Sequence, residues 1–345
     1  MASKGTILAA IVLVALIVGG GMLVMFTGIL DQEEDEASTL TDALDRSITV
    51  ETKPETIISV SPGLTEMVYA FGAGSDLIGV TSYCDYPSDV KDRVSGGTLE
   101  IIGEYYYNID EEMIIALQPD IVFLESNVQE QVNLVPKLDQ AGIQSVVMFP
   151  GENSEEIFQN LMLMGKALHE VDKATEITEM MNEKFDVIGE KIGEPEDKPT
   201  VMVCIWWDSA SIWIVGNGTF LNEMIERAGG VNAFTEKING YGEVTKEDIV
   251  VQDPDIIILL SMSMGSVDEA WNSLQNDTVL NNLHAVQQGK IFITMGQAEN
   301  AFLRQSVRMV DGTYLMGMML YPDQFEQVIP NSIGDDYNEY LPGSW

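Results

Sequence analysis

A strand–helix–strand pattern between residues 47 and 81 constrains the fold of this chain more than any other feature. The stretch SITVETKPETIISV, residues 47–60, holds two β-rich runs separated by Pro54. Ser61 and Pro62 supply a helix cap and a first-turn proline, apolar residues recur at helical spacing up to Phe71, and DLIGVT returns as a strand. Strands joined by a helix lie parallel in one sheet, so the pattern predicts an α/β fold.

Two later segments resemble each other and predict a second lobe. They are DEEMIIALQPDIVFLE, residues 110–125, and TKEDIVVQDPDIIILL, residues 245–260. In each, a glutamate (Glu112 or Glu247) stands seven residues before a proline, and Asp-Ile and an apolar run follow. A short helix that ends before Pro-Asp, followed by a buried strand, accounts for both segments. Their recurrence in the same order indicates two lobes of like design.

The longest helical tract, residues 154–192, lies between these segments. Asn153 or Ser154 caps it, apolar residues mark one face, and GEPEDKPT ends it. We therefore predict two Rossmann-like α/β lobes joined by one long α-helix. The predicted boundaries are an N-terminal α/β lobe at 47–150, the connecting long helix at 151–197, a C-terminal α/β lobe at 198–322 and a surface tail at 323–345.

The first thirty residues predict a membrane anchor. The run from Gly5 to Leu30 has no charged residue, and about 20 apolar residues suffice for a helix to cross a bilayer. Lys4 before the run and DQEEDE after it place the rest of the chain outside the cytoplasm. A cleaved signal peptide is the alternative, but its apolar region is normally ~7–15 residues long and ends in a small-residue cleavage site. We predict a single-pass transmembrane helix at 1–30 and an acidic linker at 31–46, with the bulk of the chain extracytoplasmic at the cell membrane.

Charge and motif content argue against several classes of function. The chain has 55 acidic and 17 basic residues, and a net charge of −38 does not suit nucleic-acid phosphates. Neither of the two histidines, His169 and His284, has a partner at metal-ligand spacing, and no phosphate-binding or nucleophile motif is present. Cys84 and Cys204 fall in different predicted lobes and are expected to be free thiols. We expect no catalytic residues, no metal site and no cofactor, and therefore no enzyme.

Aromatic residues gather at predicted strand ends, which is where an open α/β sheet forms its cleft. Taken alone, an aromatic residue at such a position more often belongs to the hydrophobic core than to a ligand-binding site. Together, rings from both lobes suit a large, flat, partly apolar ligand. The candidate ligand-binding residues are Tyr83, Tyr86, Tyr106, Trp206, Trp207, Trp213, Tyr241 and Phe302, with Arg304 in the same loop region as Phe302.

The stretch IISVSPGLTEMVYAFGAGSDLIGVTSYCDYP, followed by IDEEMIIALQPDIVFLE, resembles the helical-backbone class of substrate-binding proteins of ABC importers. The cobalamin and ferric-siderophore binders are the most similar members. FLNEMIERAGGVNAF, KEDIVVQDPDIIIL and LHAVQQGKIF extend the resemblance over about residues 49–321. It implies two α/β lobes joined by one long helix, an ABC permease with its ATPase as partner, a transported small molecule in place of a cofactor, and a monomer.

The resemblance also implies roles for particular residues. Glu112 and Glu247 match glutamates that dock on permease arginines, although acidic residues in a first helical turn also stabilise the helix dipole by ~0.3–1 kcal/mol. The ligand-facing aromatics of the cobalamin binders fall on Tyr83, Tyr106, Trp213 and Tyr241.

The charge balance bears on the ligand. Anionic ferric siderophores and haem are commonly met by arginines, and this chain has five, of which Arg304 alone is near the predicted cleft. A corrinoid therefore fits better than an iron chelate. Two alternatives remain, namely a cell-surface structural or sensory protein that kept the fold and lost transport, and an enzyme acting on a bound chelate, which ranks last.

Overall fold

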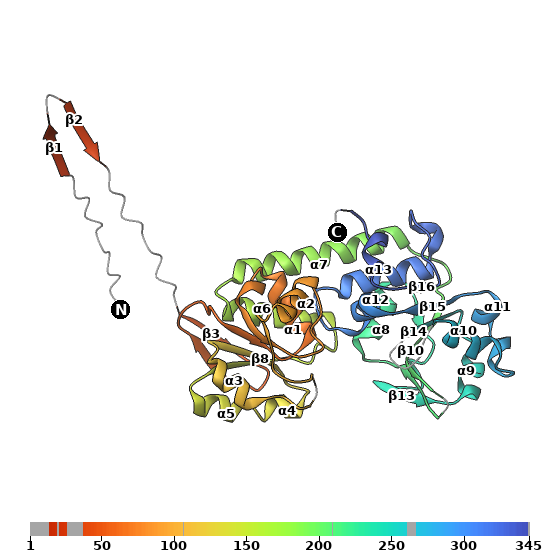
Figure 1. Cartoon of the computed structure of the whole chain (residues 1–345). Helices are drawn as coiled ribbons and strands as arrows, with labels where there is room; N and C mark the ends of the chain where they lie inside the picture. The colour runs from red at the N-terminus through yellow and green to blue at the C-terminus, as the bar shows by residue number, and fades with distance from the viewer. Residues whose placement is uncertain are drawn as a thin grey trace, which may run out of the picture. The chain divides into compact units, whose positions relative to one another are not determined.

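The computed structural model describes residues 14–18, 21–25, 37–105, 107–208, 210–260 and 267–343. The chain divides into two compact units, residues 1–36 and residues 37–345 (Figure 1). The described hydrophobic core lies in the second unit, because its clusters begin at Leu40. The second unit therefore has the core that it needs to fold on its own.

Within residues 1–30 the described residues form a β-hairpin, so the structure does not support the predicted transmembrane helix. Strand β1 (Val14–Val18) pairs antiparallel with β2 (Gly21–Met25), with Val18 opposite Gly21. Valine and isoleucine favour strands, and glycines at 19–21 weaken a helix. Within the described ranges, no helix is long and apolar enough to cross a bilayer. The rest of this segment lies outside the described residues.

The second half of the predicted acidic linker belongs to the folded unit. Strands β3 (Ser38–Thr41) and β4 (Ser47–Val50) form an antiparallel hairpin, and Leu40 is buried in the core. The Asp42 carboxylate binds Arg46 and also accepts a hydrogen bond from the backbone N–H of Val147 at 3.1 Å. An apolar residue and a satisfied carboxylate thus tie this stretch to the N-terminal lobe, whereas its high charge had pointed to a tether.

The N-terminal lobe is built on a parallel sheet with the strand order β7-β6-β5-β8-β9. The central strands are buried along their whole length, which explains their continuous apolar sequence. The strands are β5 (Ile57–Ser59), β6 (Leu77–Val80), β7 (Glu100–Ile101), β8 (Ile121–Glu125) and β9 (Gln144–Met148). The helices are α1 (Pro62–Ala70), α2 (Ser88–Ser95), α3 (Glu111–Leu117), α4 (Gln129–Val132) and α5 (Val135–Ala141), with a 3₁₀ turn at Gly74–Asp76.

The C-terminal lobe has a mixed sheet with the order β13-β11-β10-β14-β15-β16, and β12 also pairs with β10. Its strands are β10 (Thr200–Trp207), β11 (Ile212–Val215), β12 (Val231–Asn232), β13 (Tyr241–Val244), β14 (Ile256–Leu260), β15 (Ile291–Thr294) and β16 (Ser332–Ile333). Its helices are α8 (Phe220–Arg227), α9 (Lys246–Gln252), α10 (Val267–Gln275), α11 (His284–Gln287), α12 (Gly296–Leu303) and α13 (Met309–Leu320), with 3₁₀ turns at Leu280–Asn282, Pro322–Gln324 and Tyr337–Tyr340. Because β11 runs antiparallel to both β10 and β13, this lobe is not a copy of the first.

The two similar sequence segments do form equivalent structures. The first becomes α3 and β8, the second becomes α9 and β14, and each helix ends at a left-handed residue directly before Pro-Asp. The aspartate of each Pro-Asp then accepts two hydrogen bonds at 2.8 Å from one threonine on the neighbouring strand or just before it. These pairs are Asp120 with Thr56 and Asp255 with Thr200.

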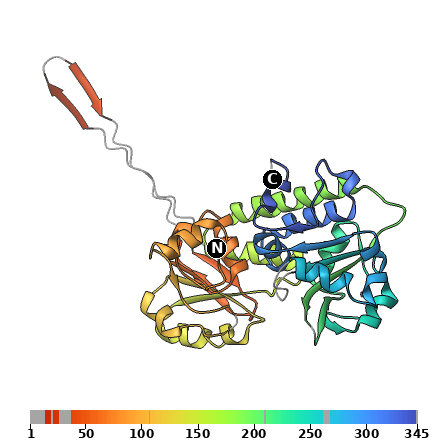
Figure 2. The same ribbon diagram turned by 45° about the vertical axis from the view of Figure 1, so that its right-hand side comes forward.

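The connecting tract is two helices and not one. Helix α6 (Ser154–Ala167) packs on the N-terminal lobe, His169 adopts a left-handed conformation with φ 55°, and α7 (Val171–Ile192) continues to the C-terminal lobe. A Cβ atom on Gly165 would lie 2.6 Å from Ala174 Cβ, so this glycine lets the two helices pack closely. Both views show α7 running along the two lobes (Figures 1 and 2).

The residues after 322 are integrated into the C-terminal lobe, whereas weak periodicity had predicted a surface tail. Strand β16 extends the sheet by pairing in parallel with β15, and Tyr337 is fully buried. The buried residues Phe325, Ile329 and Ile333 also join the core. Their irregular spacing, typical of a non-helical chain that contacts the core at intervals, concealed this from periodicity arguments.

Candidate functional site

A cavity of about 540 Å³ lies between the lobes and is the candidate ligand site. We call it the aromatic cavity. Its lining residues are Asn127 from the N-terminal lobe, Ile205, Trp206, Trp213 and Tyr241 from the C-terminal sheet, and Leu303 and Gln305 from the end of α12 and the following connection. The volume lies in the range usual for small-molecule sites.

A bulge in β10 determines which tryptophans face the aromatic cavity. The β10–β11 register shifts between Cys204 and Trp206, so that Trp206 stands opposite Trp213. The Cys204 thiol donates to the Trp206 carbonyl at 3.2 Å across this irregularity. Because side chains alternate along a strand, Trp207 points to the opposite face and is only 8% exposed in the C-terminal core.

The cavity presents its rings to solvent. Trp206 and Trp213 are each 40% exposed, and Tyr241 is 43% exposed. The indole N–H of Trp206 donates to Asp208 at 2.9 Å, which fixes one edge of that ring. Tyr241 and Trp213 come from the paired strands β13 and β11. Three partly exposed aromatic rings on one sheet provide broad apolar contact.

Two of the predicted ligand-binding residues are core residues instead. Trp207 faces away from the cavity, as described above. Phe302 on α12 is fully buried in the main core. The sequence predicts a loop at this position, but residues 296–303 form the helix α12. The residue after Phe302, Leu303, is the one that lines the cavity.

The tyrosines of the N-terminal lobe lie outside the residues that line the cavity. Tyr83 is 53% exposed, and its carbonyl accepts a hydrogen bond from Arg304 at 3.0 Å. The Tyr86 ring stacks under the Arg308 guanidinium at 3.9 Å. Tyr107 is also exposed, and a hydrogen bond with Glu104 raises the pKa of its phenol. The predicted residue Tyr106 lies outside the described residues.

Arg304 is held by ion pairs between the lobes. Its guanidinium binds Glu66 on α1 at 2.9 Å and Asp85 in the loop after β6 at 2.7 Å. Gln297 donates to the same Asp85 at 2.8 Å. The charge of Arg304 is therefore paired with two carboxylates of the N-terminal lobe. This arrangement does not support the prediction that Arg304 contacts a ligand directly.

Arg308 completes this group, which we call the interlobe cluster (Glu66, Asp85, Arg304 and Arg308). It binds both oxygens of Glu66, at 2.5 and 3.0 Å, and donates to Tyr337 at 3.3 Å. Ser306 also donates to Glu66. Glu66 stands in an otherwise apolar helical stretch, and a charge at a buried helical position was the sequence signal that could have revealed a buried ion pair.

Glu125 forms a second buried polar group that the sequence did not reveal. It ends β8, two residues before Asn127, and accepts hydrogen bonds from Ser61 and, at 2.6 Å, from Tyr105. Its backbone N–H donates to Gln131 at 2.7 Å. Burial raises the pKa of its carboxyl above the ordinary value, although both hydroxyl donors oppose the shift. This network supports the loop that carries Asn127.

The remaining chemistry does not suggest catalysis. Both cysteines are buried and unpaired, as the sequence predicts, and burial raises the thiol pKa of Cys84 and raises that of Cys204 to about 12. Neither is therefore an activated nucleophile. Among the residues that the structure describes, no group of three or more His, Cys, Asp or Glu side chains could hold a metal ion.

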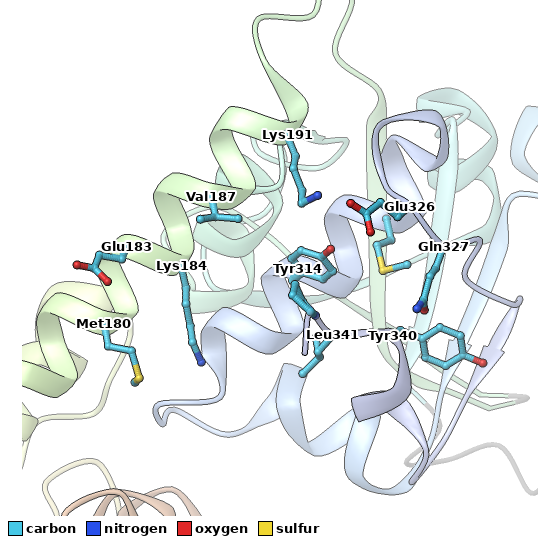
Figure 3. A pocket seen from close by; sticks show the side chains of 12 residues that line it. Met180, Glu183, Lys184, Val187, Lys191, Tyr314, Glu326, Gln327, Tyr340 and Leu341 are labelled. Carbon is cyan, nitrogen blue, oxygen red and sulfur yellow. The ribbon is translucent and has the colours of Figure 1, made fainter. Parts of the chain in front are cut away.

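A second cavity, of about 340 Å³, lies between α7, α13 and the last described residues (Figure 3). Its lining includes Lys184 and Lys191 but also Glu183 and Glu326. It contains none of the predicted site residues. Since its charges are of both signs, its lining favours no single ligand chemistry.

Two α/β lobes joined by the helices α6 and α7, with an aromatic cavity between them, define a two-lobe binding protein. Comparison with known proteins agrees with this class. The model of the family described as periplasmic binding protein matches residues 57–298, and the chain belongs to this family. The family consists of binding proteins and not of enzymes, which confirms the prediction of no enzyme.

Individual relatives are distant in sequence. The chain is 26% identical over 328 residues to the "Uncharacterized ABC transporter substrate-binding lipoprotein YvrC" of Bacillus subtilis, covering 91% of this chain and 97% of that protein. It is 23% identical over 207 residues to a vitamin B12-binding protein of Yersinia pestis, covering 59% and 69%. A periplasmic solute binding protein from Veillonella parvula shares the fold with a TM-score of 0.68 at 22% identity, covering 89% of this chain and 95% of that chain.

Proposed function

We propose that this chain is the extracytoplasmic substrate-binding protein of an ABC importer, and that it carries a corrinoid in the aromatic cavity. The observation that carries this proposal is the composition of the cavity wall. Three aromatic rings and two carboxamides meet there, and the described lining residues are all uncharged. Such a wall suits a broad ligand with an apolar face and neutral polar edges.

The charge distribution favours a corrinoid over haem or an anionic iron chelate. Arg304, the basic residue nearest to the cavity in sequence, is paired with Glu66 and Asp85. An anion that entered the cavity would lose hydration without gaining a cationic partner from its lining. The similarity to a vitamin B12-binding protein supports the same choice.

Glu112 and Glu247 are proposed to dock on the permease. Both are exposed and lie in the first turns of α3 and α9, the equivalent helices of the two lobes. One carboxylate on each lobe gives a two-point electrostatic contact for basic residues of a partner. Reversing both charges, in Glu112→Arg with Glu247→Arg, should abolish uptake and leave ligand affinity unchanged. The exposed Glu179 on α7 provides the control, because Glu179→Arg should preserve uptake.

The apolar segment from Gly5 to Leu30 is proposed to attach the folded unit to the membrane. Within a bilayer an isolated hairpin leaves backbone groups unsatisfied, whereas a helix satisfies them, so the inserted segment would be helical. Cell fractionation tests this: the full chain should sediment with membranes, and a chain starting at Ala37 should not. Recovery of the full chain in the soluble fraction would contradict the attachment.

The ligand is tested by titration of residues 37–345, a fragment that keeps the β3–β4 hairpin. Cobalamin, a panel of ferric siderophores and haem are followed by tryptophan fluorescence and calorimetry. Cobalamin should bind at submicromolar concentration, and Trp213→Ala and Tyr241→Ala should each weaken binding by about tenfold or more, the usual cost of losing a central aromatic contact. Tight binding of an iron chelate would keep the transport role and change the ligand. Binding of none of them would favour a surface protein that has lost transport.

A further inference from the structure

Gln305 occupies a distinctive position, because it lies in the short connection between α12 and α13, a segment of the C-terminal lobe that contacts the N-terminal lobe. Its neighbours Arg304 and Ser306 both bind the buried carboxylate of Glu66 on α1. The side chain between them lines the aromatic cavity. Residue 305 is therefore fixed from both sides by contacts with the opposite lobe.

Two glycines of the N-terminal lobe allow this close approach. A Cβ atom on Gly63 would lie 2.9 Å from the Gln305 carbonyl oxygen. A Cβ atom on Gly151 would lie 2.6 Å from Gln305 Cβ and 3.0 Å from its Cγ. The backbone and the stem of Gln305 thus pack against glycine backbone, which restricts the positions open to its carboxamide. Holding a polar group in place before binding reduces the entropy cost of recognition.

Asn127 provides a second carboxamide from the N-terminal lobe. It is exposed at the cavity and follows Glu125, whose buried hydrogen bonds support the loop. Asn127 and Gln305 are the polar side chains among the described lining residues, apart from the Trp and Tyr ring groups. A carboxamide both donates and accepts, so it can form two reciprocal hydrogen bonds with another amide, whereas a carboxylate offers only acceptors.

We infer that Gln305, with Asn127, selects ligands whose periphery carries carboxamides and rejects the corresponding carboxylates. The inference rests on the proposed function and narrows the substrate class of the same cavity to an amide-bearing corrinoid. Facing an amide, Gln305 can satisfy both its N–H and its C=O groups. Facing a carboxylate, its C=O oxygen remains unpaired, and no cationic side chain lines the described cavity to balance the charge.

The test compares cobalamin with cobalamin whose side-chain amides have been hydrolysed to carboxylates, using the full chain and calorimetry. The native chain should bind the amide form at least about tenfold more tightly, a ratio that one or two hydrogen bonds can supply. Gln305→Ala should lose most of that preference. In Gln305→Glu the new side chain has nearly the shape of glutamine, so the packing on Gly151 is kept. This variant should bind both forms of cobalamin more weakly, with the larger loss for the carboxylate form. Gln159→Ala, a change of an exposed glutamine on α6, should leave both affinities unchanged.

The outcomes separate this inference from the proposed function. Trp213→Ala should weaken the binding of both forms of cobalamin by the same factor, because ring contact does not distinguish amide from carboxylate. Equal binding of the two forms by the native chain, or a preference that survives in Gln305→Ala, overturns the inference and leaves the corrinoid proposal standing. Binding of neither form overturns the corrinoid proposal and the inference together.

Discussion

Removal of Arg308 should destabilise the protein far more than removal of an ordinary surface charge. Arg308 is 3% exposed and Glu66 is 2% exposed, and two hydrogen bonds join them. Burial alone would lower the pKa of the guanidinium, but Glu66 raises it above the ordinary arginine value, so Arg308 stays charged although it is buried. Deleting one partner of a buried ion pair typically costs about 3–5 kcal/mol, because the other charge stays buried.

The lower end of that range applies to Arg308→Met. Arg304 would still contact Glu66 at 2.9 Å, so the carboxylate would keep one cation. We therefore expect a loss of about 3 kcal/mol in the free energy of unfolding. The measurement is urea denaturation of residues 37–345 followed by tryptophan fluorescence. The matched control is Lys173→Met, which breaks an exposed pair with Glu176 and should cost less than about 1 kcal/mol.

A double-mutant cycle makes the test stricter. If the two residues stabilise each other, Glu66→Gln combined with Arg308→Met should cost clearly less than the sum of the two single changes. Strict additivity, or a loss for Arg308→Met no larger than that for Lys173→Met, would refute the view that the interlobe cluster is a coupled buried group.

Further predictions concern the pH dependence of stability and the division between core and site. Burial raises the pKa of Glu125, so the folded state binds this proton more tightly than the unfolded chain, and stability is lost as pH rises above the ordinary value of 4.5. Glu125→Gln should therefore have the same melting temperature as the native protein near pH 4 and a higher one towards pH 8. A difference in melting temperature that is equal at every pH would contradict this. Partial burial opposes the shift in Asp255, but hydrogen bonds from Thr200 hold its pKa below the ordinary value, so Asp255→Asn should lose most at neutral pH and least near pH 3. In the core, Trp207→Ala should cost about 3–5 kcal/mol of unfolding free energy, while ligand affinity per folded molecule stays unchanged. Trp213→Ala should instead lower ligand affinity and leave the free energy of unfolding unchanged. A loss of affinity in Trp207→Ala at matched folded fraction would refute the assignment.

The sequence predicted the two α/β lobes because local signals carried them. Helix caps, Pro-Asp stops and continuous apolar strands act over a few residues, and both similar segments formed the expected helix and strand. Trp206, Trp213 and Tyr241 could be placed at the cavity for a related reason, since each lies near a strand end, and their role in ligand binding stays a prediction.

The features that sequence reasoning missed depend on contacts between distant residues. Trp206 and Trp207 are adjacent and chemically identical, and only the bulge in β10 decides which one faces the cavity. Arg304 resembles a ligand-binding residue until Glu66, 238 residues away, is placed beside it. The break at His169 and the strand β16 were likewise invisible to periodicity, because close helix packing and sheet pairing determine them.

The interlobe cluster also has a consequence for how the chain can be made. Glu66 is separated by 242 residues from Arg308, so during synthesis the first lobe is complete long before its cation exists. Until then the carboxylate must either remain hydrated, which keeps α1 from packing fully, or be buried without a partner, which is costly. The final docking of α1 therefore waits for the last third of the chain, and the two lobes should not be separable into independently stable halves.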